Sequence, residues 1–143
     1  MKPLLSRTVV AMVAFLVWSP MLLRAAPPGS PQATAAAPEP PVIDAALAGQ
    51  YALEGVMETG SEVWLKPDGH FQWYWSYGAV DLAAQGRWHR DGTTVVLQVD
   101  EFRGPEQFPE GKFDTMRLRI DGADLVPAWP WENGAERGRY SRE

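Results

Sequence analysis

Residues 42–143 are predicted to form an all-β domain, a small antiparallel up-and-down barrel of about eight strands. Two observations predict it. Apolar and polar residues alternate over short segments, and glycine-containing turns separate these segments. After a possible single helical turn near 44–48, no stretch keeps the period of a helix. The expected strands cover 50–57, 61–66, 70–77, 80–90, 93–99, 113–120, 123–129 and 136–141.

Closure of the sheet follows from its one-sided pattern. An antiparallel meander with one apolar face must be covered or must close on itself, because that face needs burial and the edge strands need partners. The region offers almost no helix that could cover a sheet. Closure into a barrel is therefore the expected architecture, and a two-sheet β-sandwich is the alternative.

Five turns set the expected pairing of the strands, since a wrong register would turn polar side chains into the core. Three-residue turns ending in a left-handed glycine are expected at 58–60 and 67–69, and two-residue turns at 78–79, 91–92 and 121–122. The two Asp-Gly turns would need positive φ at both central residues. The turns pair Leu53 with Leu65, Leu65 with Phe71, Tyr77 with Val80, Trp73 with Ala84, Trp88 with Val95 and Leu118 with Leu125.

These registers gather the large apolar side chains on one face, as a packed interior requires. The other face carries charged and amide side chains and both histidines. The residues expected to point inward are Tyr51, Leu53, Val63, Leu65, Phe71, Trp73, Trp75, Tyr77, Leu82, Trp88, Val95, Leu97, Val99, Met116, Leu118 and Ile120.

The first 26 residues have the pattern of a secretory signal peptide. Lys2 and Arg7 precede an unbroken apolar run over 9–18, and small residues follow at Ala25 and Ala26, where cleavage is expected. The run is shorter than the roughly 20 residues of a transmembrane helix, so an uncleaved anchor is the less favoured alternative. We expect a periplasmic or secreted protein without stable membrane insertion after cleavage.

A linker and an acidic domain follow the signal. Residues 27–41 read PPGSPQATAAAPEPP, which has almost no bulky apolar side chain and predicts a disordered Pro/Ala-rich tether. The chain has 13 basic and 18 acidic residues; removal of Lys2, Arg7 and Arg24 with the signal changes the net charge from −5 to −8. Such a domain should repel nucleic acid and anionic lipid, so neither is expected as a partner.

Several motifs are similar to those of small lipocalin-like barrels of the bacterial envelope. They lie in GQYALEG (49–55), SEVWLKPDGHFQWYWSYG (61–78) and GRWHRDGTTVVL (86–97). They look most like the N-terminal barrel of NlpE-type envelope lipoproteins, and the resemblance implies fold more than activity. That family's lipid-attachment Cys and C-x-x-C pair are absent, because the chain has no cysteine, so no metal or redox role carries over. The matching positions are Gly49, Tyr51, Asp68, Gly69, Phe71, Gly86, Trp88, Gly92 and Leu97.

Few groups are available for catalysis, and no catalytic residue is predicted. His70 and His89 are expected on the polar face, where a histidine is usually only solvated. No buried histidine is expected that could activate a serine. Carboxylates gather in the connection 100–112, but they lack the alternate-residue spacing of a calcium loop. We expect no enzyme, no metal and no cofactor.

The aromatic side chains leave two interpretations open. They could line a cavity for an apolar ligand, with the long connection folded over its mouth. They could instead fill the interior, which the pairing of Trp73 with Ala84 favours, because an eight-stranded barrel is about wide enough for side chains alone. The candidate ligand-binding residues are Trp73, Trp75, Tyr77, Trp88, Phe102 and Phe108.

An aromatic patch is expected on the outer face at Trp64, Gln72 and Tyr74, and it is a candidate protein-contact surface. Cover by the chain ends is the alternative, since Trp129 and Trp131 also need a place to pack. The expected function is that of a non-enzymatic envelope accessory or binding module acting through its outer face or loops. The alternatives are a carrier or sensor of a small apolar ligand, and an inhibitor of an envelope or secreted enzyme.

Overall fold

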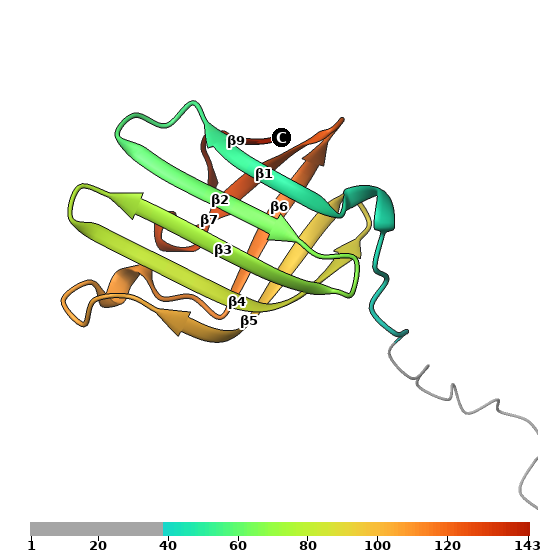
Figure 1. Ribbon diagram of the computed structural model, residues 1–143, viewed down its shortest axis with the longest axis horizontal. Helices are drawn as coiled ribbons and strands as arrows, with labels where there is room; N and C mark the ends of the chain where they lie inside the picture. Colours follow the sequence, from blue (N-terminus) through green and yellow to red (C-terminus); the bar gives the residue numbers. More distant parts are fainter. Residues whose placement is uncertain (1–38) are drawn as a thin grey trace, which may run out of the picture. The chain divides into compact units, whose positions relative to one another are not determined.

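Antiparallel strands close into an eight-stranded barrel, and one additional short strand pairs with a strand of the ring (Figure 1). The computed structural model describes residues 39–143. The predicted signal peptide, 1–26, and most of the predicted linker, 27–41, lie outside the described residues. The prediction of an all-β up-and-down barrel is confirmed.

The elements are short strands joined by tight turns and three single-turn 3-10 helices. The strands are β1 (Gly49–Glu54), β2 (Thr59–Leu65), β3 (His70–Tyr77), β4 (Val80–Asp91), β5 (Thr94–Arg103), β6 (Thr115–Asp121), β7 (Asp124–Trp129), β8 (Ala135–Glu136) and β9 (Arg139–Arg142). The 3-10 helices are η1 (Ala45–Leu47), η2 (Pro109–Gly111) and η3 (Pro130–Glu132).

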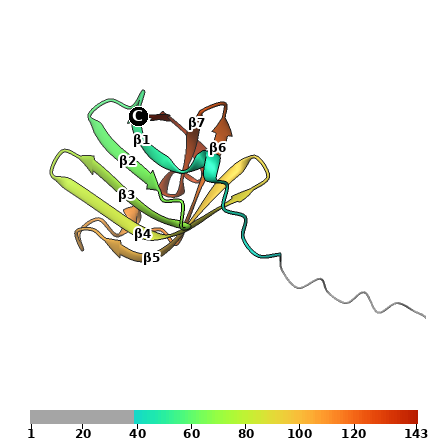
Figure 2. The ribbon, with the colours of Figure 1, turned by 45° about the vertical axis from the view of Figure 1, so that its right-hand side comes forward.

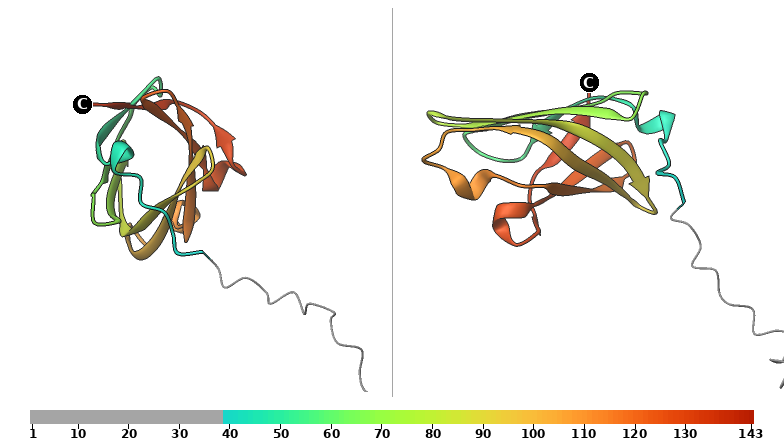
Figure 3. Two further views of the ribbon diagram at one scale, coloured as in Figure 1. Left: turned by 90° about the vertical axis from the view of Figure 1, so that its right-hand side faces the viewer. Right: turned by 90° about the horizontal axis from the view of Figure 1, so that it is seen from below.

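The ring closes at two places. Strands β1 to β7 pair in chain order, and β9 then lies between β7 and β1, pairing Tyr140 with both Leu125 and Leu53. The left view of Figure 3 looks along the barrel and shows this ring. The sandwich alternative is wrong, because neither β1 nor β6 is left as a free sheet edge.

The last expected strand, 136–141, is interrupted. Gly138 has a φ of 76° between β8 and β9, and a Cβ atom there would lie 3.0 Å from the carbonyl oxygen of Glu54. Only a residue without a side chain fits this left-handed, close approach to β1. The break separates β8, which pairs with β7, from β9, which lies between β7 and β1.

Two predicted registers are confirmed. The turn at 67–69 pairs Leu65 with Phe71, and the turn at 78–79 pairs Tyr77 with Val80 and Trp73 with Ala84. In each turn the glycine has a positive φ, as expected.

The other three registers are wrong. Between β1 and β2, Leu53 was expected to lie opposite Leu65. The register is shifted, and Tyr51 lies opposite Val63 instead. Trp88 pairs with Leu97 and not with Val95. Leu118 pairs with Pro127, and Leu125 pairs with Ile120. In all three hairpins the observed register differs from the expected one by an even number of residues, so the apolar side chains still face inward.

The error at the Asp-Gly turns has a local cause. Gly92 (φ 58°) and Gly122 (φ 64°) occupy the first position of the two-residue turn, as Gly78 (φ 56°) does in the β3–β4 hairpin. Within residues 39–143 the non-glycine residues with positive φ are Glu58 and Asn133, so neither Asp91 nor Asp121 has the left-handed conformation expected for the turn. Each is the last residue of its strand. A turn with glycine first needs one left-handed residue, which removes the strain that aspartate would carry.

The β4–β5 register shifts between Gln85 and Gly86, where Asp100 is the extra residue of a β-bulge in β5, and the pairing continues to Arg103. At Gly86 a Cβ atom would lie 2.0 Å from the carbonyl oxygen of Gln98. Glycine is therefore required by the close approach of the neighbouring strand, not by a left-handed φ. The bulge extends β5 beyond its expected end at residue 99.

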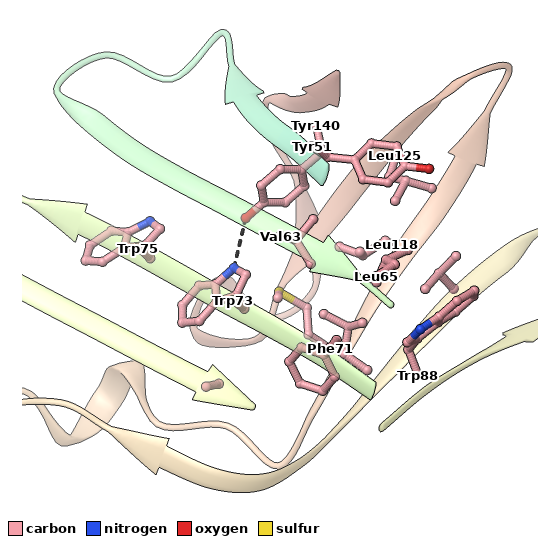
Figure 4. Packing of buried hydrophobic residues seen from close by; sticks show 14 of the residues in the cluster. Tyr51, Val63, Leu65, Phe71, Trp73, Trp75, Trp88, Leu118, Leu125 and Tyr140 are labelled. Carbon is pink, nitrogen blue, oxygen red and sulfur yellow. Dashed lines mark hydrogen bonds between the residues drawn. The ribbon is translucent and has the colours of Figure 1, made fainter. Parts of the chain in front are cut away.

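The interior is packed with large side chains from all sides of the ring (Figure 4). Of the residues expected to point inward, Leu53, Val99 and Ile120 are only partly buried, and Tyr77 is half exposed at the end of β3. The fully buried ones include Tyr51, Val63, Leu65, Phe71, Leu82, Trp88, Val95, Leu97, Met116 and Leu118.

One end of the barrel is covered by η1, and we call it the η1 end (Figure 2). Buried Leu47 belongs to this helix, and its carbonyl accepts a hydrogen bond of 2.8 Å from the Tyr51 hydroxyl. The Asp44 side chain caps the helix and accepts a hydrogen bond from Arg90, which lowers the pKa of this carboxyl group. The chain thus reaches the barrel along β4 and seals this end.

Candidate functional site

The opposite end, which we call the cleft end, carries the longer connections. They are the segments 55–58, 104–114 and 130–134, together with the turn at 78–79. Binding residues gather on such loops when a rigid scaffold positions them. The η1 end, by contrast, has the short turns at 66–69, 92–93 and 122–123.

Aromatic side chains close the interior at the cleft end. Phe113, from the 104–114 segment, packs edge-on against Trp73 at 5.1 Å between ring centroids. Phe108 stacks on Trp75 at 6.3 Å, and Trp131 of η3 meets Trp75 at 5.6 Å. Offset and edge-to-face pairs of this kind stabilise beyond the area they bury. The core is therefore covered by rings and not by backbone.

An open cleft of about 600 Å³ lies beside this aromatic layer. Its walls contain Trp75, which is 9 % exposed, and Tyr77, which is 50 % exposed. Met57 is 87 % exposed at the tip of the β1–β2 loop. The lining residues are Gly55, Val56, Met57, Glu58, Thr59, Trp75, Tyr77, Trp129, Trp131, Glu132 and Arg137.

The charged side chains of the cleft are Glu58, Glu132 and Arg137. Arg137 forms an ion pair with Glu132, whose side chain is the more buried of the two. The Arg137 carbonyl also accepts a hydrogen bond of 2.8 Å from the indole of Trp129. These contacts hold the segment after η3 against the aromatic wall.

Both left-handed non-glycine residues of the described chain belong to the segments that form this cleft. Glu58 has a φ of 58°, and Asn133, directly after Glu132, has a φ of 55°. Asparagine adopts this conformation readily, but for glutamate it is unfavourable. Such strain concentrates at functional sites, where surrounding structure maintains it.

The structure separates the six residues that we considered as one ligand-binding set. Trp75 and Tyr77 line the cleft. Trp73 and Trp88 lie in the core at 2 % and 1 % exposure. Phe102, in β5, and Phe108, in the 104–114 segment, are partly buried and pack on the core.

The sequence pattern did not indicate the remaining walls of the cleft. Trp129 and Trp131 were noted only as residues that needed a packing partner, and Val56 and Met57 were assigned to a strand. The useful signal was the pair of tryptophans in the proline-containing stretch WPW, 129–131, which η3 turns toward the barrel mouth. No local pattern indicates that this stretch meets Trp75.

A directional chain of hydrogen bonds crosses the interior near the cleft. Figure 4 shows its first link, between Trp73 and Tyr140. The indole of Trp73 donates to the Tyr140 hydroxyl at 2.9 Å, and the two hydroxyl oxygens of Tyr140 and Ser61 lie 2.6 Å apart. Ser61 in turn donates to the carbonyl of Tyr74, so Tyr140 donates to Ser61. Burial raises the pKa of Tyr140 well above its ordinary value, which keeps the hydroxyl protonated. The chain ties β2, β3 and β9 together.

The outer-face patch is present as side chains on neighbouring strands. Trp64 and Gln72 are directly paired across β2 and β3, and Tyr74 is the next outward residue. Trp64 is 47 % and Tyr74 44 % exposed. Lys66 lies over the Trp64 ring at 4.8 Å, and the Tyr74 hydroxyl donates to Asp81. Part of each aromatic side chain in the patch is therefore already in contact with a neighbouring residue.

The two histidines lie on the outer wall of adjacent strands and line one shallow depression with Arg87. His70 lies 3.2 Å from Asp68. Within residues 39–143 no group of three or more His, Cys, Asp or Glu side chains is placed to hold a metal ion. Over the same residues, no helix has the length and apolar character needed to cross a membrane.

No family model, curated protein or solved structure matches this chain. The similarity to NlpE-type barrels stays a prediction that rests on the sequence motifs.

Proposed function

We propose that the domain is an exported, non-enzymatic binding module that holds an apolar ligand in the cleft at the mouth of the barrel. The observation that carries this proposal is the cleft itself. Its volume of about 600 Å³ is that of a typical ligand pocket, and four aromatic side chains line it. The ligand would bind at the mouth and not among the core side chains.

The chemistry of the lining supports binding over catalysis. Its ionisable side chains are two carboxylates and one guanidinium, and Arg137 and Glu132 pair with each other. The Thr59 hydroxyl donates to the Met57 carbonyl, and no histidine lines the cleft to act as its base. Nucleophilic catalysis needs such a base within hydrogen-bond reach.

The β1–β2 loop supplies an adaptable edge. Met57 projects from the loop tip, and methionine fits ligands of varied shape because its side chain is flexible and polarizable. The opposite wall, with Trp75 and Trp129, is anchored in strands. Strand-anchored aromatic rings facing the flexible side chain of Met57 suit a carrier or sensor of small apolar molecules.

A titration with the neutral fluorescent probe N-phenylnaphthylamine tests this function. Saturable enhancement of its fluorescence, with energy transfer from tryptophan, is the expected result for the folded monomer. Tyr77→Ala and Met57→Ala should weaken the binding several-fold, because both remove apolar surface from the cleft. Trp64→Ala, which removes an exposed ring from the outer face, is the matched control and should leave the affinity unchanged. Absence of binding, or equal weakening by Trp64→Ala, would refute the proposal.

A second candidate is contact with an envelope protein, including an enzyme that the domain would inhibit, through the outer face. It is favoured by the exposure of Trp64 and Tyr74 on neighbouring strands. If it holds, immobilised wild-type protein should capture a single envelope component in stoichiometric amount. A variant with Trp64→Ala and Tyr74→Ala should lose that capture, and Tyr77→Ala should retain it.

A further inference from the structure

We infer that the ligand of the cleft is an apolar organic cation, for example a quaternary ammonium compound. The inference rests on the proposed function and adds the sign of the ligand's charge. Two independent features of the cleft support it, the arrangement of its aromatic rings and the balance of its charges.

The first feature is a group of electron-rich rings around one space. The ring planes of Trp75 and Tyr77 are inclined by 28°, with ring centroids 6.2 Å apart. Trp131 meets Trp75 at 67°, and Trp129 lies 5.0 Å from Trp131. The faces of tryptophan and tyrosine rings attract cations, and cages of several rings recognise quaternary ammonium groups. A neutral ligand of the same shape lacks the attraction between a full positive charge and the ring faces.

The second feature is an excess of negative charge. Two carboxylates, Glu58 and Glu132, line the cleft with a single cation, Arg137. Arg137 is paired with Glu132, and no ion pair within residues 39–143 involves Glu58. The cleft therefore presents one uncompensated negative charge. Apolar rings with a carboxylate at their edge complement a cation and repel an anion.

Three ligands with the same benzyl group isolate the effect of charge. Benzyltrimethylammonium, benzyl alcohol and phenylmethanesulfonate are each used to displace N-phenylnaphthylamine from the purified chain. We expect the cation to bind about tenfold more tightly than the alcohol, and the sulfonate to bind more weakly than both. The preference for the cation should decrease as salt is added.

Charge-neutralising variants locate the preference. Glu132→Gln leaves Arg137 without its partner and should reduce the preference for the cation about tenfold. Glu58→Gln removes the unpaired carboxylate and should reduce it about threefold. Glu62→Gln makes the same change on the outer face of β2 and should have no effect. Glu58 is exposed on a loop, so its variant keeps the test valid if Glu132→Gln fails to fold.

The outcomes separate the inference from the function on which it rests. If the probe binds but the cation displaces it no better than the alcohol, the ligand class is wrong and the apolar site stands. A preference that Glu62→Gln abolishes as strongly as Glu58→Gln does would also overturn it, because the charge effect would then not come from the cleft. If the probe does not bind at all, both the function and the inference fail.

Discussion

The two ends of the barrel differ in how they cover the same core. At the η1 end, the Tyr51 hydroxyl and the Trp88 indole each donate to a backbone carbonyl, of Leu47 and Lys66 respectively. At the cleft end, Trp75 and Trp131 pack mainly against other rings, and Tyr77 is half exposed. Satisfied polar groups and short turns make the first end a closed cap, whereas rings on long connections make the second a surface that a ligand can use.

The largest expected difference between the two ends is in stability. Trp88→Ala removes a fully buried side chain and should lower the free energy of unfolding by about 3–5 kcal/mol. Tyr77→Ala removes a half-exposed ring at the cleft end and should lower it by less than about 1 kcal/mol. Denaturant unfolding followed by circular dichroism measures both. Equal losses would show that the cleft end is as much a part of the core as the η1 end.

The hydrogen-bond chain beneath the cleft should contribute next. Tyr140→Phe leaves the buried indole of Trp73 without an acceptor and should lower the free energy of unfolding by about 1–3 kcal/mol. Tyr51→Phe, the same change at the η1 end, removes the donor to the Leu47 carbonyl and an acceptor for Arg142, and it is the comparison. A loss for Tyr140→Phe no larger than experimental error would mean that the chain does not constrain the strands.

The same tyrosine predicts sensitivity to alkali. Burial raises the pKa of Tyr140 above the ordinary value of about 10, so the unfolded chain loses this proton at a lower pH than the folded chain does. The stability from the protonated hydroxyl is therefore fully present below about pH 10 and decreases above it, by up to about 1.4 kcal/mol per pH unit. Tyr140→Phe should reduce that slope in unfolding measurements between pH 8 and pH 11. An unchanged slope would assign alkaline unfolding to other groups, such as Tyr51, whose pKa burial also raises.

The turns at the η1 end provide a smaller and sharper test. Gly92→Val places a β-branched side chain at a φ of 58° and should lower the free energy of unfolding by about 1–2 kcal/mol. Asp91→Thr should change it by no more than about 0.5 kcal/mol, because Asp91 is extended at the end of β4. A large effect of Asp91→Thr would instead support the turn that the sequence predicted.

The smallest expected effect is at the tip of the cleft-end loop. Met57→Ser changes a side chain that is 87 % exposed and should leave the midpoint of thermal unfolding within the error of measurement. The same variant should still weaken binding of the apolar probe. A clear loss of stability would show that Met57 has a structural role in closing the barrel.

Much of the fold could be predicted, because every second residue of a strand points inward. Three strand registers were predicted wrongly, but each was shifted by an even number of residues, so the same side chains still face the core. The pairing of Trp88 with Leu97 could not be predicted from the Asp-Gly dipeptide alone. Asp-Gly is compatible with two turn positions one residue apart, and in the position found here glycine comes first, so that aspartate needs no positive φ.

The all-β class, the inward face and the turn glycines Gly69, Gly78, Gly92 and Gly122 could be predicted from the sequence, since these depend on side-chain alternation and on local backbone conformation. Gly60 was expected to end a turn but lies within β2. Which aromatic residues fill the core and which line a cleft could not be predicted in this way. Trp73 and Trp75 are two residues apart on one face of β3, yet one is covered by Phe113 and the other borders open space beside Trp129. That distinction depends on where the 104–114 segment and η3 fold back over the mouth, which is a matter of contacts between residues distant in the chain.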